Sequence, residues 1–303
     1  MRTPRASPHP PEAFTASAVG LFVLVVYART LYPDVPGGDA GELIAAVATG
    51  GVPHPPGYPL YALLGEAFLH VPFGTVAWRL NLMSAACDSA AAAVLYLAVA
   101  RWARSTWAGL AATMLFAFAP AIWGYAVLAE VFALNNLFVA LLLLLAVMWQ
   151  ETRDRRWVLW GALVFGLGLS NHQTIVFTGA PLSAWALWTG RRDLLRLRPL
   201  LWIVSLFALG LIPHLYLPIA AARDAAVTWG AADTRSGFWT HVLRREYGTF
   251  QLASTGVGSA VPASATLAAW ARHLVDQIGR ERERPTRGAR CSHGGLVIVF
   301  AMS

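Results

Sequence analysis

The sequence Gly37-Gly38-Asp39-Ala40-Gly41-Glu42 follows the first hydrophobic segment of the chain and places two carboxylates three residues apart. A second motif comes shortly after it, Pro53-His54-Pro55-Pro56-Gly57-Tyr58-Pro59. It holds one imidazole among prolines, which fix φ and stiffen the backbone. Charged groups beside a membrane are costly, so they are usually retained for function. We therefore expect the functional site in this loop.

The composition is typical of a membrane protein. The chain has 303 residues, of which 57% are hydrophobic and only 13% are charged. A soluble domain carries about a quarter charged residues, and several apolar runs approach the roughly 20 residues that a helix needs to cross a bilayer. The predicted fold class is an all-α polytopic membrane protein.

The charge and the cysteines exclude other classes. The net charge of +7 comes from short basic clusters between apolar runs, so we expect no nucleic-acid partner. The two cysteines, Cys87 and Cys291, provide neither a disulfide framework nor a metal-ligand spacing. We expect no metal and no cofactor.

Seven hydrophobic segments are predicted to span the membrane, at about 14–31, 82–100, 107–123, 131–149, 157–169, 175–188 and 200–219. The fifth and sixth are near the short limit for a span. In the connection 32–81, an amphipathic helix is predicted from Asp39 to Thr49, with its apolar face along the membrane surface. A second amphipathic stretch is predicted at about 60–69.

These segments divide the chain into four predicted regions. Residues 1–13 form a cytosolic tail, and 14–221 form the transmembrane domain with its first lumenal loop at 32–81. Residues 222–280 form a lumenal segment, and 281–303 an atypical C-terminal tail. The first span is predicted to remain as a signal anchor, because no cleavage site follows it.

The arginines predict the orientation of the chain. They gather in the N-terminal tail and in the loops after the second, fourth and sixth spans, whereas the opposite loops hold few. Positive residues favour the cytosolic side, so the N-terminus is predicted to be cytosolic. The polar and ionisable candidates then all share the non-cytosolic side: Asp39, Glu42, His54, Glu130, Asn171, His172 and the region 229–247.

Each candidate also has a structural interpretation. Asp39 and Glu42 have the spacing of a capping box at the start of a helix. Turn, helix-end or surface roles are the alternatives for the others, namely His54, Glu130, Asn171, His172, Arg244 and Arg245. Their convergence on one side of the membrane favours a site.

Sugar transfer from a lipid phosphate fits such a site. It needs a carboxylate that takes a proton from the acceptor hydroxyl, and Asp39 is the predicted base. It also needs a cation, best an arginine, to hold the leaving phosphate. The segment Phe238–Gly248 predicts a short helix at the membrane surface with Arg244 and Arg245 near its end, and Arg79 is the alternative phosphate ligand.

Seven motifs resemble one known family, in order along most of the chain. They are G-G-D-A-G-E-L from Gly37, H-P-P-G-Y-P-L-Y from His54, W-R-L-N-L from Trp78, A-E-V-F-A-L-N-N-L-F from Ala129, G-L-G-L-S-N-H-Q-T from Gly166, T-W-G-A-A-D-T-R-S-G-F from Thr228 and R-R-E-Y-G-T-F from Arg244. The chain resembles the transmembrane protein O-mannosyltransferases of the animal endoplasmic reticulum. That family acts on IPT domains of plexins and receptor tyrosine kinases.

The resemblance implies a glycosyltransferase-C fold in the endoplasmic reticulum membrane and inverting transfer of mannose. The implied donor is dolichyl-phosphate mannose, and the implied acceptors are Ser or Thr hydroxyls of secretory-pathway proteins. Asp39 and Glu42 match the family's acidic pair and are the expected catalytic residues. The expected substrate-binding residues are His54, Tyr58, Arg79, Glu130, Asn171, His172, Arg244, Arg245 and Tyr247.

Two departures from the family keep other functions open. Ala40 stands where the family usually has serine, and after about Gly279 the chain ends in an Arg-rich and apolar tail where relatives continue. The alternatives are a catalytically inactive truncated isoform, an assembly partner, or a lipid or solute transporter. A transporter predicts inverted repeats and charges near the membrane midplane, whereas the candidate carboxylates lie at the ends of predicted spans.

Overall fold

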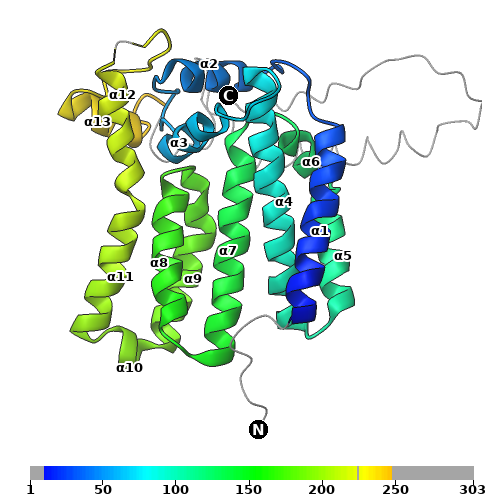
Figure 1. The fold of residues 1–303 in the computed structure, drawn as a ribbon. Helices are drawn as coiled ribbons and strands as arrows, with labels where there is room; N and C mark the ends of the chain where they lie inside the picture. Colours follow the sequence, from blue (N-terminus) through cyan, green and yellow to red (C-terminus); the bar gives the residue numbers. More distant parts are fainter. Residues whose placement is uncertain (1–9, 224, 248–303) are drawn as a thin grey trace, which may run out of the picture. The chain divides into compact units, whose positions relative to one another are not determined.

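The computed structural model describes residues 10–223 and 225–247. The chain divides into two compact units, Met1–Leu243 and Arg244–Ser303. The first unit is a bundle of helices that run between two ends, drawn as the upper and lower ends in Figure 1. Its long helices are α1 (Pro10–Arg29), α4 (Val76–Ala103), α7 (Val131–Thr152) and α11 (Leu197–Gly210), the last continued by η2 (Ile212–Leu215) and α12 (Tyr216–Ala221).

By length and composition alone, fewer described helices than the predicted seven are able to cross a membrane. Among the described residues, four are long and apolar enough: 12–29, 76–103, 131–152 and 197–221. The pair α5 (Thr106–Ala117) and α6 (Pro120–Ala126) makes a fifth if its 66° bend is accepted within one span.

The predicted fifth and sixth spans correspond to α8 (Arg156–Leu169) and α9 (Val176–Thr189), which follows the short turn η1 (Gln173–Ile175). Each helix has 14 residues, about 21 Å of rise, which is less than the roughly 30 Å hydrocarbon core. Both nevertheless run along the bundle in alternating directions, as predicted, and α10 (Arg191–Leu194) follows at the lower end (Figure 1).

Two short helices, α2 (Ala40–Thr49) and α3 (Pro59–Phe68), form a layer at the upper end (Figure 1). The predicted amphipathic face of α2 exists, but it packs on protein, because Leu43 and Val47 are buried in the core cluster with Tyr61 and Leu80. Gly65 of α3 allows this contact, since a Cβ there would lie 2.9 Å from Val47. The largest buried core therefore lies directly beneath the loop that carries the candidate residues.

A buried arginine joins three helices at the lower end. Arg101 of α4 lies 2.7 Å from the Glu151 carboxylate of α7 and 3.3 Å from that of Glu12 on α1. Breaking a buried ion pair by removing one partner is strongly destabilising. This group therefore fixes the lower ends of α1, α4 and α7 together.

One carboxyl departs from the expectation that acidic residues lie at span ends. Asp88 is fully buried in the middle of α4 and accepts a hydrogen bond of 3.0 Å from the Asn136 amide of α7. A polar residue inside a span is expensive and usually pairs with a neighbouring helix. Asp88 thus couples α4 to α7, the helix that begins beside the candidate site.

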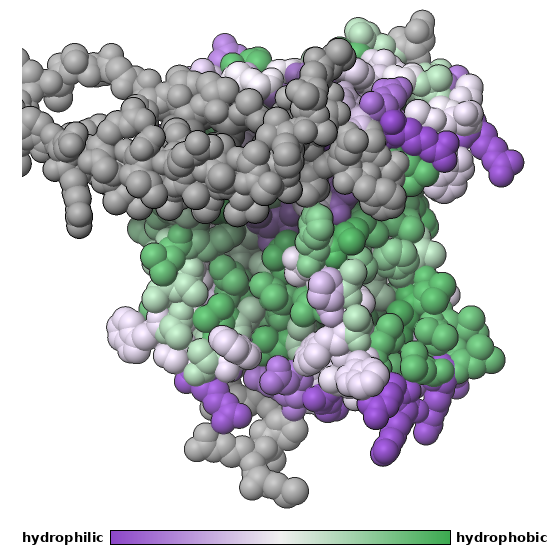
Figure 2. All heavy atoms as spheres, turned by 180° about the vertical axis from the view of Figure 1, so that it is seen from behind, coloured by the Kyte–Doolittle hydropathy of each residue, from purple (hydrophilic) through white to green (hydrophobic). Residues whose placement is uncertain are grey.

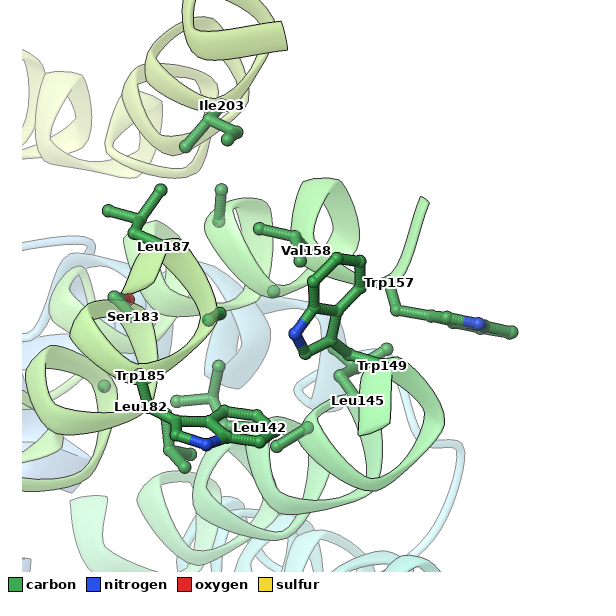
Figure 3. A pocket seen from close by; sticks show the side chains of 15 residues that line it. Leu142, Leu145, Trp149, Trp157, Val158, Leu182, Ser183, Trp185, Leu187 and Ile203 are labelled. Carbon is green, nitrogen blue, oxygen red and sulfur yellow. The ribbon is translucent and has the colours of Figure 1, made fainter. Parts of the chain in front are cut away.

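The surface agrees with a membrane location. On the face drawn in Figure 2, hydrophobic residues form a band across the helices, and hydrophilic residues gather along its lower edge. A small cavity lies between α7, α8, α9 and α11, and Figure 3 shows Trp149 and Trp185 beside it. Its described lining is apolar except for Ser183 and the tryptophan N–H groups, so it carries no candidate chemistry.

Candidate functional site at the upper end

The predicted capping box does not form. Asp39 occupies the N-cap position of α2, but its side chain makes no capping hydrogen bond. Glu42 instead turns to the proline-rich loop, where its carboxylate accepts the backbone N–H of His54 at 2.8 Å and contacts the ring Nδ1 at 2.5 Å. The spacing of the two carboxylates therefore serves a tertiary contact, and the structural alternative for this pair is wrong.

The imidazole of His54 is held on both sides. Its Nδ1 faces Glu42, and its Nε2 lies 3.0 Å from the Tyr58 hydroxyl and 3.9 Å from a carboxylate oxygen of Asp39. The Asp39 side chain is 66% exposed, whereas that of His54 is 17% exposed. Asp39 is thus the member of this cluster that an incoming molecule reaches from solvent.

The loop around His54 is fixed by distant segments. The ring Nε2 of His241, on α13 (Arg235–Val242), contacts the carbonyl of Pro53 at 3.0 Å. Val52 forms an isolated parallel bridge with Thr228 and accepts a hydrogen bond from the backbone N–H of Trp229. This bridge brings the Trp229 ring to 6.5 Å from the imidazole of His54.

The electrostatics of the cluster favour a protonated imidazole. Burial lowers the pKa of His54, but the hydrogen bond and charge of Glu42, with the charges of Asp39 and Glu130, outweigh it and raise the pKa above its ordinary value of 6.5. In its protonated form, the imidazole lies between the carboxylates of Glu42 and Asp39. Such a cation can hold an anionic group or orient Asp39.

Glu130 is the third carboxyl of the cluster. It occupies the N-cap position of α7 without a side-chain capping bond and is buried, with its backbone N–H and C=O both bonded to the Ser84 hydroxyl of α4. Burial, then the negative charge of Asp39, raises the pKa of Glu130 to about 7. Glu130 is therefore a group that can exchange a proton near neutral pH.

Asn171 and His172 have different roles. Asn171 is buried, and its side-chain amide donates to the carbonyl of Val131 at 3.1 Å, which fixes the first turn of α7 beside Glu130. His172 faces the cluster, with its ring parallel to that of Tyr58 at 5.8 Å and near that of Phe132 at 5.4 Å. Asn171 therefore has a structural role, whereas the imidazole of His172 lies among the aromatic rings beside the cluster.

The three predicted phosphate ligands belong to different parts of the chain. Arg79 donates to the carbonyls of Leu69 and Phe73 and so closes the end of α3. Helix α13 ends at Val242, before the two predicted phosphate ligands, and its Val242 packs against the core instead of a membrane surface. Arg244 and Arg245 belong to the second unit, in which the Arg244 guanidinium lies 5.7 Å from the Tyr247 ring.

Two aromatic residues near the cluster were not predicted. Tyr125 and Phe132 lie on either side of Glu130 in the sequence, and their rings are 4.9 Å apart. The sequence does contain a signal for them, because both aromatic residues lie close to an acidic residue at the start of a predicted helix. Among the described residues, no three His, Cys, Asp or Glu side chains gather as metal ligands do.

Comparisons with known proteins place this geometry in a family. Residues 39–195 match the family model described as the protein O-mannosyl-transferase TMEM260 N-terminal domain. The chain is 41% identical over 251 residues to a Mus musculus protein named protein O-mannosyl-transferase TMEM260, covering 80% of this chain and 36% of the relative. It is 36% identical over 284 residues to the protein O-mannosyl-transferase tmem260 of Dictyostelium discoideum, covering 87% of this chain and 35% of the relative.

The chain thus spans about a third of the length of these curated relatives. No solved structure matches it. The matched region begins at Asp39 and includes His54, Glu130 and His172, and so contains most of the carboxylate–imidazole cluster. The chain belongs to the protein O-mannosyl-transferase TMEM260 family and carries its N-terminal domain.

Proposed function

We propose that this chain contains the catalytic site of a protein O-mannosyltransferase that moves mannose from dolichyl-phosphate mannose to serine or threonine hydroxyls. The observation that carries the proposal is the cluster of Asp39, Glu42, His54 and Glu130 at one end of an apolar helical bundle. A lipid-linked donor keeps its tail in the bilayer, so its sugar phosphate reaches a site at such an end. The names of the relatives supply the reaction class.

In the proposed reaction Asp39 is the general base. Its carboxylate takes the proton of the acceptor hydroxyl while the hydroxyl oxygen attacks the anomeric carbon of mannose. The bond from that carbon to the phosphate oxygen breaks, and dolichyl phosphate leaves with the electron pair. Attack opposite the leaving group inverts the anomeric configuration. A base must reach the acceptor proton, and the exposure of Asp39 supports this role.

Glu42 and His54 act on Asp39 in this proposal. Glu42 orients the imidazole through two contacts, and the imidazolium Nε2 faces the base at 3.9 Å. A positive charge at this distance can hold the Asp39 carboxylate in one orientation toward the acceptor hydroxyl. Tyr58 and His172 form a stacked aromatic wall suited to a sugar face.

The donor phosphate needs a cation, and we assign it to Arg244 or Arg245. The assignment rests on sequence: a guanidinium forms two parallel hydrogen bonds to a phosphate, which an ammonium does not. Arg79 is the weaker alternative, because its guanidinium already donates to two backbone carbonyls.

The proposed location is the endoplasmic reticulum membrane, with the N-terminus cytosolic and the cluster lumenal. The proposed acceptors are folded IPT domains. Glycosylation acceptors engineered near residues 40 and 230 are expected to be modified, and one near 153 is not. Modification near 153 alone would reverse the orientation.

The test is a transfer assay with the purified full chain, dolichyl-phosphate mannose and a folded acceptor domain, with the anomeric configuration of the product determined. Asp39→Asn keeps the size of the side chain and removes its basicity, so turnover is expected to fall by roughly 100-fold or more. Asp34→Asn is the matched control, because it removes an exposed carboxylate of the same loop that accepts the backbone N–H of its neighbour Val35. Equal turnover of the two variants would reject Asp39 as the base, and no transfer by the wild-type chain would reject the proposed function.

A further inference from the structure

A second cavity lies at the lower end of the bundle, away from the carboxylate–imidazole cluster. It has a volume of about 410 Å³ and lies between the first turns of α8 and α11. Its lining includes three arginines, Arg155, Arg156 and Arg198, together with apolar side chains. The proposed transfer reaction does not use this cavity.

The lining has the same order on both helices. On α8, Arg156 is followed four residues later by Trp160, and on α11, Arg198 is followed by Trp202 and then Leu206. Residues four apart share a helix face and lie about 6 Å apart along the axis. The cavity is therefore basic at the helix starts and apolar one turn further into the bundle.

The packing of the two helices leaves room for the cavity. Near the far end of α8 the backbones touch, because a Cβ on Gly166 would collide with the carbonyl of Phe207 and lie 3.0 Å from Gly210. At the cavity the facing residues are Trp160 and Trp202, each 55% exposed. Glycine contact at one end and tryptophans at the other leave a wedge that opens toward the membrane.

Two of the three arginines at the mouth have no acidic partner in the described part of the chain. Arg156 lies 3.2 Å from Asp154. Within the described residues, however, neither Arg155 nor Arg198 has an acidic partner within 4 Å. Both helices also begin here, so the positive ends of their dipoles add to the field of the arginines. The mouth is thus complementary to an anion, and tryptophan is typical of the depth where headgroups meet acyl chains.

We propose that this cavity binds an anionic phospholipid. Its phosphate lies against Arg155 and Arg198, and one acyl chain lies along Trp202 and Leu206. Charge complementarity at the mouth and the apolar wedge behind it together select this occupant, since basic pockets between membrane helices are suited to anionic headgroups.

The test measures lipid binding to the purified full chain by native mass spectrometry, with phosphatidylserine and phosphatidylcholine of identical acyl chains. Phosphatidylserine is expected to bind more tightly. Each arginine near a membrane surface accounts for about 5-fold in affinity for anionic lipid, so the double variant R155Q/R198Q is expected to lose on the order of 25-fold. The control R191Q/R192Q removes the same charge from α10, at the same end but outside the cavity, and is expected to keep the wild-type affinity.

A second variant tests the apolar part. Leu206→Trp fills the wedge and leaves the arginines in place, so it is expected to weaken binding of phosphatidylserine. Phosphatidylserine should also raise the melting temperature of the wild-type chain and not that of R155Q/R198Q, since a ligand of the folded state stabilises it. Equal binding of the two lipids, equal losses in R155Q/R198Q and R191Q/R192Q, or unchanged binding in Leu206→Trp would each overturn the proposal.

Discussion

Replacing Glu42 by glutamine tests the core of the candidate site. The carboxylate makes two contacts with His54, to its backbone N–H at 2.8 Å and to its ring at 2.5 Å. Glutamine keeps one acceptor oxygen for the backbone N–H but presents an amide to the ring. A hydrogen bond to a charged group contributes about 1.5–3 kcal/mol, so Glu42→Gln is expected to destabilise the chain by that amount while His54 is protonated.

The stability lost on replacing Glu42 by glutamine depends on pH, and the direction of this dependence can be predicted. Glu42 is the main cause that raises the pKa of His54 above 6.5. A base with a raised folded-state pKa adds stability that is fully present below its unfolded pKa and is lost as pH rises through the folded value. The wild-type advantage over Glu42→Gln is therefore expected to be largest below pH 6.5 and to shrink at alkaline pH.

The assay is the melting temperature of the purified chain in one detergent, measured from pH 6 to pH 9. A loss of 1.5–3 kcal/mol corresponds to roughly 3–12 °C for a domain of this size. Glu66→Gln is the control, because Glu66 accepts from the Tyr216 hydroxyl and lies near Arg223, with no imidazole involved. Its effect is expected to be flat over this range. A Glu42→Gln effect that is also flat, or absent at pH 6, would refute the Glu42–His54 pair.

Three further predictions use other parts of the molecule. Burial raises the pKa of Glu130 from 4.5 to about 7, so the wild-type chain loses stability as pH rises through this window. The melting temperature of Glu130→Gln is therefore expected to rise relative to that of the wild type between pH 4.5 and pH 7. A constant difference between the two melting temperatures would contradict the burial of an ionisable carboxyl. Substituting lysine for Arg244 or Arg245 keeps the positive charge but removes the guanidinium that can form two parallel hydrogen bonds to a phosphate, so at least one variant is expected to raise KM for the donor lipid. Unchanged kinetics in both variants would show that neither arginine binds the phosphate. Gly57 has a φ of 89°, and a Cβ there would lie 2.7 Å from Leu217; Gly57→Ala is expected to lose about 1–3 kcal/mol, whereas Gly37→Ala, with open space around it, should melt like the wild type.

The sequence predicted which site residues lie at the same end of the bundle, but it did not predict the contacts between them. Alternating apolar segments bring every second loop to the same end of a bundle, which is why Asp39, His54, Glu130 and His172 were predicted to share a side. The structure confirms that they lie together. Periodicity and loop charge require no knowledge of packing, so they predict which residues can meet.

The errors arise where packing decides. The spacing of Asp39 and Glu42 fits a capping box and also fits a contact of Glu42 with His54, so the sequence alone did not distinguish the two arrangements. The fifth and sixth spans were predicted near the short limit, and α8 and α9 have that length, with 14 residues each; whether so short a helix crosses a membrane is decided by its surroundings. Arg79 was a candidate because it is a cation in the right loop, and only the fold shows that backbone carbonyls occupy its guanidinium.

The loop that holds His54 receives several of its supporting contacts from residues that come much later in the chain. The Tyr216 hydroxyl donates to the carbonyl of Gly51, Thr228 bridges Val52, and His241 contacts the carbonyl of Pro53. At roughly 5–20 residues per second of synthesis, the loop waits on the order of 10–40 s for the last of these partners. During biosynthesis these later supports therefore become available only well after the loop itself has been made, so the full set of contacts around the site is completed late in the synthesis of this unit.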